Sequence, residues 1–239
     1  MGRLFLVRHA QASFLEPNYD KLSATGETQA RLLGEYWARH KLIFDRVCSG
    51  PGVRHQDTAK IVRNAYAKTG LEFPAPVVMD EFDEFHGDEV LEKGIPRLLD
   101  CKPVIQELHR AFQEANGPDE RPRKFQKLFE ALITLWVSEE LVLDHVESWE
   151  EFTARVNRGV TKSLAASSKG ERVAIFTSGG PIAVSIQRAL HLSPRDTLNL
   201  AWVLRNCSCS EFLFSGDRFT LSTFNSFPHL DGAALLTYR

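Results

Sequence analysis

The chain has 239 residues, of which 43% are hydrophobic and 25% charged, a composition that suits one α/β domain carrying an insertion. The formal net charge of −2 gives no general attraction for nucleic acid or for an anionic membrane surface, so neither is expected as a partner. No apolar run approaches the roughly 18 residues that span a bilayer, and we expect a cytoplasmic protein.

The first third of the chain predicts strands that alternate with helices. Residues 3–7 fit a short buried strand, and residues 25–37 fit a helix with apolar side chains at helical spacing. A second strand is expected at 46–48, a second helix from 53 to 70, and a third strand at 77–79. Each strand ends in a polar loop, which is where open α/β sheets place their functional residues.

Residues 90–147 interrupt this alternation, because they carry helical periodicity and no strand signal. One amphipathic helix is expected over 98–112 and another over 125–136. We therefore predict a single domain over residues 1–239, with residues 90–147 as a helical cap that is inserted into it and shapes substrate choice.

The last third returns to strands and helices. Ser148 and Glu151 form a capping box before a helix, and residues 173–176 form a buried strand that leads into another helix. Two further strands at 211–214 and 219–224 form a hairpin. Together the elements predict a three-layer α/β/α fold with a doubly wound, mostly parallel sheet that the hairpin closes at one edge.

Five segments spread along the chain carry the most specific signal. They are Leu6-Val7-Arg8-His9-Ala10-Gln11, Leu22-Ser23-Ala24-Thr25-Gly26, Ser49-Gly50-Pro51-Gly52-Val53-Arg54 with Thr58-Ala59, Ser148-Trp149-Glu150-Glu151-Phe152, and Asn225 with His229-Leu230. In this order they resemble the histidine phosphatase (phosphoglycerate-mutase-like) superfamily. The resemblance implies a phosphomonoester phosphatase that forms a phosphohistidine intermediate and needs no cofactor. The four cysteines lack the spacing of metal ligands, so no metal site is predicted.

The resemblance also gives individual residues their roles. His9 would be the catalytic nucleophile, while Arg8 and Arg54 would bind the phosphate. A phosphoryl group in transfer spreads negative charge over three oxygens, which planar guanidinium groups can grip in pairs. A general acid must protonate the leaving oxygen. Glu81 is predicted for this role because its neighbourhood resembles the family's placement, and Glu84 is the alternative.

The sequence departs from the family pattern at two positions. Ala10 replaces the usual glycine, which is a mild change if the backbone φ angle there is negative. Thr177-Ser178-Gly179-Gly180 stands where the family typically has Ser-His-Gly-Gly, so Ser178 replaces a histidine that donates to the phosphoryl oxygens. Ser178 and Gly179 are still expected to bind phosphate. Losing a donor of this kind costs about 10²–10³ in rate, so Ser178→His is expected to raise turnover.

Three functions stay open on the sequence alone. The protein is a phosphatase of small phosphorylated substrates, or a non-catalytic module that binds such a ligand or inorganic phosphate. A cation or histidine that fills the space beside Ser178 would favour catalysis. The third alternative is an esterase with Ser178 as nucleophile, Asp196 or Asp217 as acid and His229 as base. The sequence leaves a homodimer open. Three other histidines are expected to have no catalytic role: His55, His86 and His109.

Overall fold

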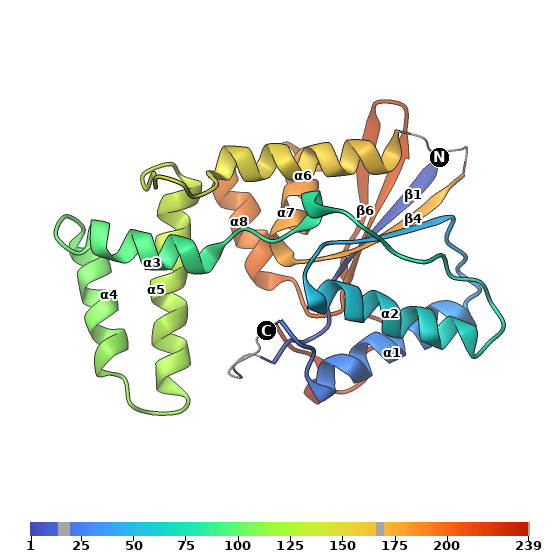
Figure 1. Cartoon of the computed structure of the whole chain (residues 1–239), viewed down its shortest axis with the longest axis horizontal. Helices are drawn as coiled ribbons and strands as arrows, with labels where there is room; N and C mark the ends of the chain where they lie inside the picture. The colour runs from blue at the N-terminus through green and yellow to red at the C-terminus, as the bar shows by residue number, and fades with distance from the viewer. Residues whose placement is uncertain (14–19, 166–169, 239) are drawn as a thin grey trace. The chain divides into compact units, whose positions relative to one another are not determined.

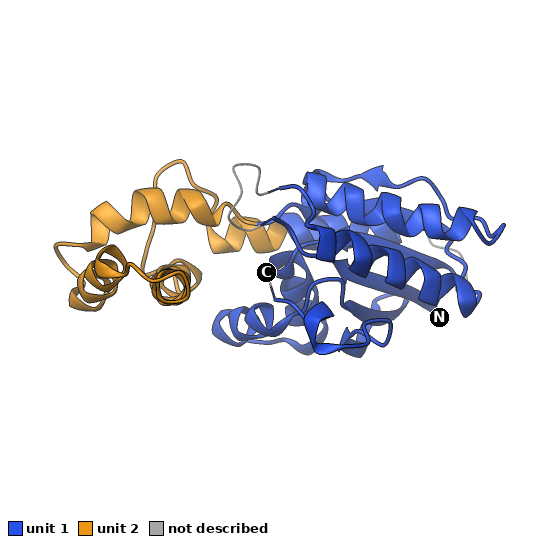
Figure 2. Cartoon of the chain, turned by 90° about the horizontal axis from the view of Figure 1, so that it is seen from below, with its two compact units in different colours: residues 1–84, 155–239 blue, residues 85–154 orange. Residues whose placement is uncertain are grey.

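The computed structural model describes residues 1–13, 20–165 and 170–238. The chain divides into two compact units, one made of residues 1–84 and 155–239 and the other of residues 85–154 (Figure 2). The second unit begins and ends within a few residues of the predicted insertion, 90–147, and its regular elements are helices.

The first unit contains one six-stranded sheet with the strand order β3-β2-β4-β1-β5-β6. In chain order the strands are β1 (Gly2–Arg8), β2 (Arg46–Ser49), β3 (Val77–Val78), β4 (Arg172–Thr177), β5 (Cys209–Ser215) and β6 (Arg218–Ser226). The first four strands pair in parallel, while β5 and β6 add an antiparallel hairpin beside β1. The predicted sheet with a hairpin at its edge is confirmed.

Helices cover both faces of the sheet, so the unit has three layers (Figure 1). The helices are α1 (Ala24–Arg39) and α2 (Val53–Ala67) on one face, and α6 (Trp149–Leu164), α7 (Gly179–Leu190) and α8 (Pro194–Val203) on the other. In β1, Phe5 and Val7 join the core under α1 and α2, whereas Leu4 and Leu6 join the core under α6 and α7. Burial on both faces explains why this strand is a continuous apolar run.

Side-chain caps fix where two of these helices begin. The Ser23 hydroxyl accepts a hydrogen bond from the Gly26 amide at 3.0 Å, so α1 starts one residue before the predicted Thr25. At α6 the predicted capping box is confirmed. The Ser148 amide donates to the Glu151 carboxylate at 2.8 Å, and the Glu151 amide donates to the Ser148 hydroxyl at 3.2 Å.

The second unit differs from the prediction in its helix count. Residues 98–112 do not form one helix, because α3 (Gly87–Leu98) ends and α4 (Pro103–Glu114) begins within them. Pro103 lacks the amide that a helix interior needs, and it occupies the first turn of α4, where that amide is not required. The predicted helix over 125–136 is present as α5 (Glu120–Val137).

No helix was predicted from the sequence over residues 194–203, where the structure has α8. The Ser193 hydroxyl accepts from the Asp196 amide at 3.1 Å and Pro194 follows it, so the start signals of α8 are present in the sequence. None of the helices that the structure describes is long and apolar enough to span a membrane.

Candidate active site

The carboxyl ends of β1 and β4 lie next to each other and position two of the predicted residues. Arg8 pairs with Thr177 in the parallel register, so His9 and Ser178 follow adjacent strand ends. The His9 amide donates to the Thr177 carbonyl at 2.7 Å. The site therefore lies at the carboxyl ends of the parallel strands, where open α/β folds place ligands.

His9 is buried and its ring is oriented by the backbone. Its Nδ1 lies 2.8 Å from the Ala10 carbonyl oxygen. Because a carbonyl can only accept, Nδ1 carries the proton of the neutral ring and the lone pair is on Nε2. Burial holds the pKa of His9 well below its usual value, and the positive charges of Arg54 and Arg8 lower it further. His9 is therefore a neutral imidazole at neutral pH, with the lone pair on Nε2.

The loop after His9 is tied to α2. The Ala10 amide donates to the Thr58 hydroxyl at 3.1 Å, and that hydroxyl donates to the Arg54 carbonyl at 2.6 Å. Ala10 is not among the residues with positive φ, so this backbone accepts alanine in place of glycine without strain. These contacts hold His9 and Arg54 in a fixed relation.

Arg54 is held on two sides. Its Nη1 donates to the Asp20 carboxylate at 2.7 Å, and its Nη2 donates to the Ser178 hydroxyl at 3.2 Å. Asp20 also accepts from the Val53 amide at 2.7 Å, which caps α2. Because Gly52, the N-cap residue, has no side chain to do this, Asp20 both starts the helix and orients the guanidinium. No motif in the sequence pointed to Asp20.

Arg8 is anchored by a hydrogen bond from its Nη1 to the carbonyl oxygen of Leu204. Its charge acts on His9 together with that of Arg54. The structure thus places two guanidinium groups within electrostatic reach of the His9 ring, and Arg54 in contact with Ser178. This is the arrangement that an anion with several oxygens needs.

His55 joins this cluster, which the sequence analysis did not expect. It is buried, its Nε2 lies 2.6 Å from the Ser178 Oγ, and its ring centroid lies 5.6 Å from that of His9. Burial and then Arg54 hold the pKa of His55 well below its usual value. The signal was present in the sequence: the chain lacks a histidine at 178 and has one directly after Arg54.

The two candidate acids, Glu81 and Glu84, contact different parts of the fold. Glu81 lies in the 3₁₀ turn η1 (Asp80–Phe82), and its carboxylate pairs with Lys162 of α6, which lowers the pKa of Glu81. The chain leaves the turn at Asp83 with an extended backbone. Glu84 then accepts a hydrogen bond from the Gly180 amide at 3.0 Å. Glu84, rather than Glu81, is the carboxylate beside the Ser178 turn.

Gly179, which was predicted to contact phosphate, is the first residue of α7. Its amide belongs to the first turn of that helix, whose partial positive charge favours anions. The Ser178 side chain does not cap α7, because its hydroxyl is directed to Arg54 and His55 instead.

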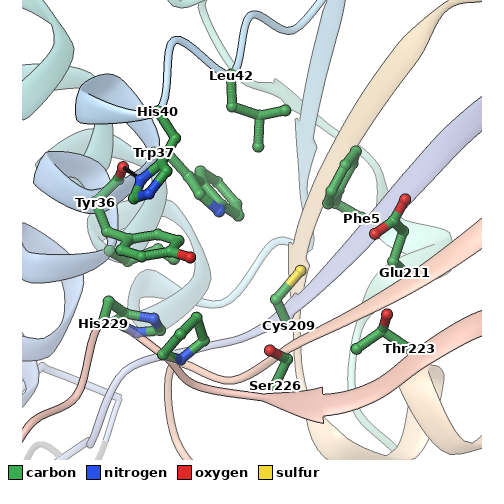
Figure 3. A pocket seen from close by; sticks show the side chains of 12 residues that line it. Phe5, Tyr36, Trp37, His40, Leu42, Cys209, Glu211, Thr223, Ser226 and His229 are labelled. Atoms are coloured by element: carbon green, nitrogen blue, oxygen red, sulfur yellow. Dashed lines mark hydrogen bonds between the residues drawn. The ribbon is translucent and has the colours of Figure 1, made fainter.

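His229 lies elsewhere, in a pocket of about 270 Å³ between α1 and the β5–β6 hairpin (Figure 3). Figure 3 shows Tyr36 and His229 on one side of this pocket and Glu211 on the other. Ser178 is not among the residues that line it. The Asp196 carboxylate accepts from the Ser193 hydroxyl at 2.6 Å. The serine esterase triad considered above is therefore not assembled by the described residues.

His229 is expected to lower the stability of the fold in acid. It is buried, and burial lowers its pKa from 6.5 to about 4. Between pH 6.5 and about pH 4 the unfolded chain protonates His229 while the folded chain keeps it neutral. The free energy of unfolding therefore falls as the pH drops through this range. This residue alone should lower the free energy of unfolding by about 3 kcal/mol between pH 7 and pH 4. His229→Phe should remove that part of the loss in urea unfolding at both pH values; an undiminished loss would refute this role for His229.

The fold and the cluster define an α/β protein with a histidine between two arginines at a sheet edge. The sequence matches the histidine phosphatase superfamily (branch 1) over residues 4–94 and 100–226, and the chain belongs to this family. The search of curated proteins found no match.

Solved structures of similar fold include two phosphatases and a phosphoglycerate mutase. A mycobacterial glucosyl-3-phosphoglycerate phosphatase in complex with inorganic phosphate is 20% identical, with a TM-score of 0.60, over 97% of this chain and 100% of that one. The alpha-ribazole phosphatase from Shigella flexneri is 18% identical, with a TM-score of 0.60, over 94% and 96%. A phosphoglycerate mutase from Bacillus anthracis is 15% identical, with a TM-score of 0.61, over 95% and 94%. At these identities the similarity shows a shared fold.

Proposed function

We propose that the protein is a phosphomonoester phosphatase in which the substrate's phosphoryl group is transferred first to His9 and then to water. The observation that carries the proposal is the state of His9: a buried, neutral imidazole whose Nδ1 is bound to the Ala10 carbonyl and whose Nε2 is left to attack. The two guanidinium groups whose charges act on the His9 ring would bind the phosphoryl oxygens. Similar structures named as phosphatases, one of them with inorganic phosphate, support the same class of substrate.

The chemistry proceeds in two steps. The His9 Nε2 attacks phosphorus, a nitrogen–phosphorus bond forms, and the bond to the leaving oxygen breaks. Glu84 in its protonated form gives that oxygen a proton. Water then attacks the phosphohistidine, Glu84 takes the proton from water, and inorganic phosphate leaves with His9 neutral again. We assign the acid role to Glu84 because its carboxylate is bonded to the turn that holds Ser178.

A binding module without catalysis is less well supported. The space beside Ser178 is occupied by Arg54 and His55. A cation and a histidine at this position are what a phosphatase that has lost its usual histidine would need.

We also propose that residues 85–154 form the cap that shapes substrate choice. This helical unit is inserted directly after Glu84, so the general acid and the inserted unit are neighbours in the chain. Insertions in loops that follow strand ends commonly adapt one fold to different ligands.

The test is a steady-state assay of the whole chain with p-nitrophenyl phosphate and with alkyl phosphate monoesters. Bis(p-nitrophenyl) phosphate and p-nitrophenyl acetate serve as controls for diesterase and esterase activity. We expect hydrolysis of the monoesters only, with inorganic phosphate as a competitive inhibitor. Binding of inorganic phosphate without turnover of any monoester would contradict the proposal and favour the binding module.

A further inference from the structure

We propose that Arg54 and His55 together make the Ser178 hydroxyl a dedicated hydrogen-bond donor to the phosphoryl group. The Ser178–His55 pair would then take the place of the histidine that the family has at position 178. The inference rests on the proposed function. In it, His55 is a positioning residue that orients the hydroxyl proton of Ser178.

Two groups approach the Ser178 oxygen and decide where its proton points. A hydroxyl has one proton to donate and two lone pairs to accept with. The Arg54 Nη2, which can only donate, lies 3.2 Å from the Ser178 Oγ. The His55 Nε2 lies 2.6 Å from the same oxygen. If His55 also donates, both lone pairs are filled and the hydroxyl proton must point to a third group.

The surroundings of the other ring nitrogen show that His55 donates. Its Nδ1 is buried and has no hydrogen-bond partner among the described residues. A β-carbon at Gly50 would lie 2.5 Å from Nδ1, so the Cα–H of Gly50 points toward this nitrogen. A C–H group can face a lone pair as a weak donor, whereas an N–H would meet another hydrogen there. The proton of the neutral ring is therefore on Nε2.

The Ser178 proton is then available for substrate. No residue in the described part of the chain accepts it, and Ser178 follows the strand beside the one that leads into His9. An oxygen of a phosphoryl group that approaches the His9 Nε2 is the acceptor this geometry fits. Because the hydroxyl oxygen accepts from a cation and from a buried imidazole, its O–H is polarised and becomes a stronger donor.

Gly50 and Gly52, in the loop before α2, leave room for the His55 ring. At Gly50 a side chain would collide with the His55 ring, and at Gly52 a β-carbon would lie 3.1 Å from Nδ1. Ser178 is 1% exposed, so the volume beside it is already filled by His55. His55 therefore occupies the space that a histidine side chain at position 178 would need.

The test is a double-mutant cycle on the whole chain with p-nitrophenyl phosphate. Ser178→Ala and His55→Phe should each lower kcat by about 10- to 100-fold with little change in KM, and the double variant should be no worse than the poorer single variant. His55→Gln, whose side-chain amide can donate to Ser178, should recover about tenfold over His55→Phe. Additive losses, an equal loss in His55→Gln and His55→Phe, or full kcat in Ser178→Ala would overturn the inference.

A second readout does not depend on turnover. The ¹⁵N NMR spectrum of the neutral His55 ring should show the proton on Nε2, and a proton on Nδ1 would overturn the inference. The affinity for orthovanadate should show the same non-additive losses in the cycle. If the cycle holds for vanadate binding while the wild-type protein hydrolyses no monoester, the proposed function fails and the donor role of Ser178 stands.

Discussion

His9→Asn is expected to lower kcat for p-nitrophenyl phosphate by about 10⁴- to 10⁶-fold, the size of loss seen when a covalent nucleophile is removed. Asparagine keeps a side-chain amide that can donate to the Ala10 carbonyl, as Nδ1 does at 2.8 Å. It has no counterpart of the nucleophilic Nε2. The variant should therefore fold and still bind inorganic phosphate, because the two arginines remain. Steady-state kinetics and phosphate titration measure the two effects separately.

The matched control is His191→Asn. His191 is exposed, ends α7 and has a left-handed backbone, a conformation that asparagine tolerates well. Its kcat should stay within about twofold of the wild-type value. If His9→Asn keeps a tenth or more of the wild-type kcat, His9 is not the nucleophile.

Glu84→Gln is expected to lower kcat for an alkyl phosphate by about 10²- to 10⁴-fold, the usual contribution of a general acid. The glutamine carbonyl can still accept from the Gly180 amide, so the turn before α7 is kept. The loss in kcat/KM, which reports the phosphorylation step alone, should be much smaller with p-nitrophenyl phosphate, because its leaving group departs without a proton. Comparing the two substrates separates an acid from a structural carboxylate.

Glu81→Gln is the control for this prediction. Glu81 pairs with Lys162, whose side chain is 64% exposed, and an ion pair of this kind contributes at most about 1 kcal/mol. Turnover of both substrates should therefore be close to that of the wild type. A large loss in Glu81→Gln with little loss in Glu84→Gln would return the acid role to Glu81.

Local sequence patterns were sufficient for most of the fold. The strand before His9 is a short run that is apolar on both faces, and the capping box at Ser148 marks the start of α6 directly. The breaks before Pro103 and Pro194 are not visible in the apolar periodicity, and only the helix-start signals at these prolines mark them.

The site was harder to predict because it depends on contacts between distant residues. Ser178 and His55 are 123 positions apart, and only the fold brings them to 2.6 Å. The choice between Glu81 and Glu84 depends on where the chain leaves a short 3₁₀ turn, which no periodic pattern encodes. Asp20 likewise acts on Arg54 across 34 positions.

The structure also changes what we expect of Ser178→His. The sequence alone suggested a gain, since a histidine would restore a donor to the phosphoryl oxygens. In the fold, His55 already fills the space beside residue 178, so a second ring would crowd the first. A gain is now expected only when His55→Ala accompanies the substitution.

Trapping the phosphorylated intermediate shows whether the phosphoryl group passes through His9. The wild-type chain is mixed rapidly with a phosphate monoester, quenched in alkali, where phosphohistidine survives, and mapped by mass spectrometry. We expect one phosphoryl group on the peptide that contains His9, lost after acid treatment and absent from His9→Asn. A phosphoryl group on Ser178, or full turnover with no phosphorylated histidine at any quench time, would contradict transfer through His9.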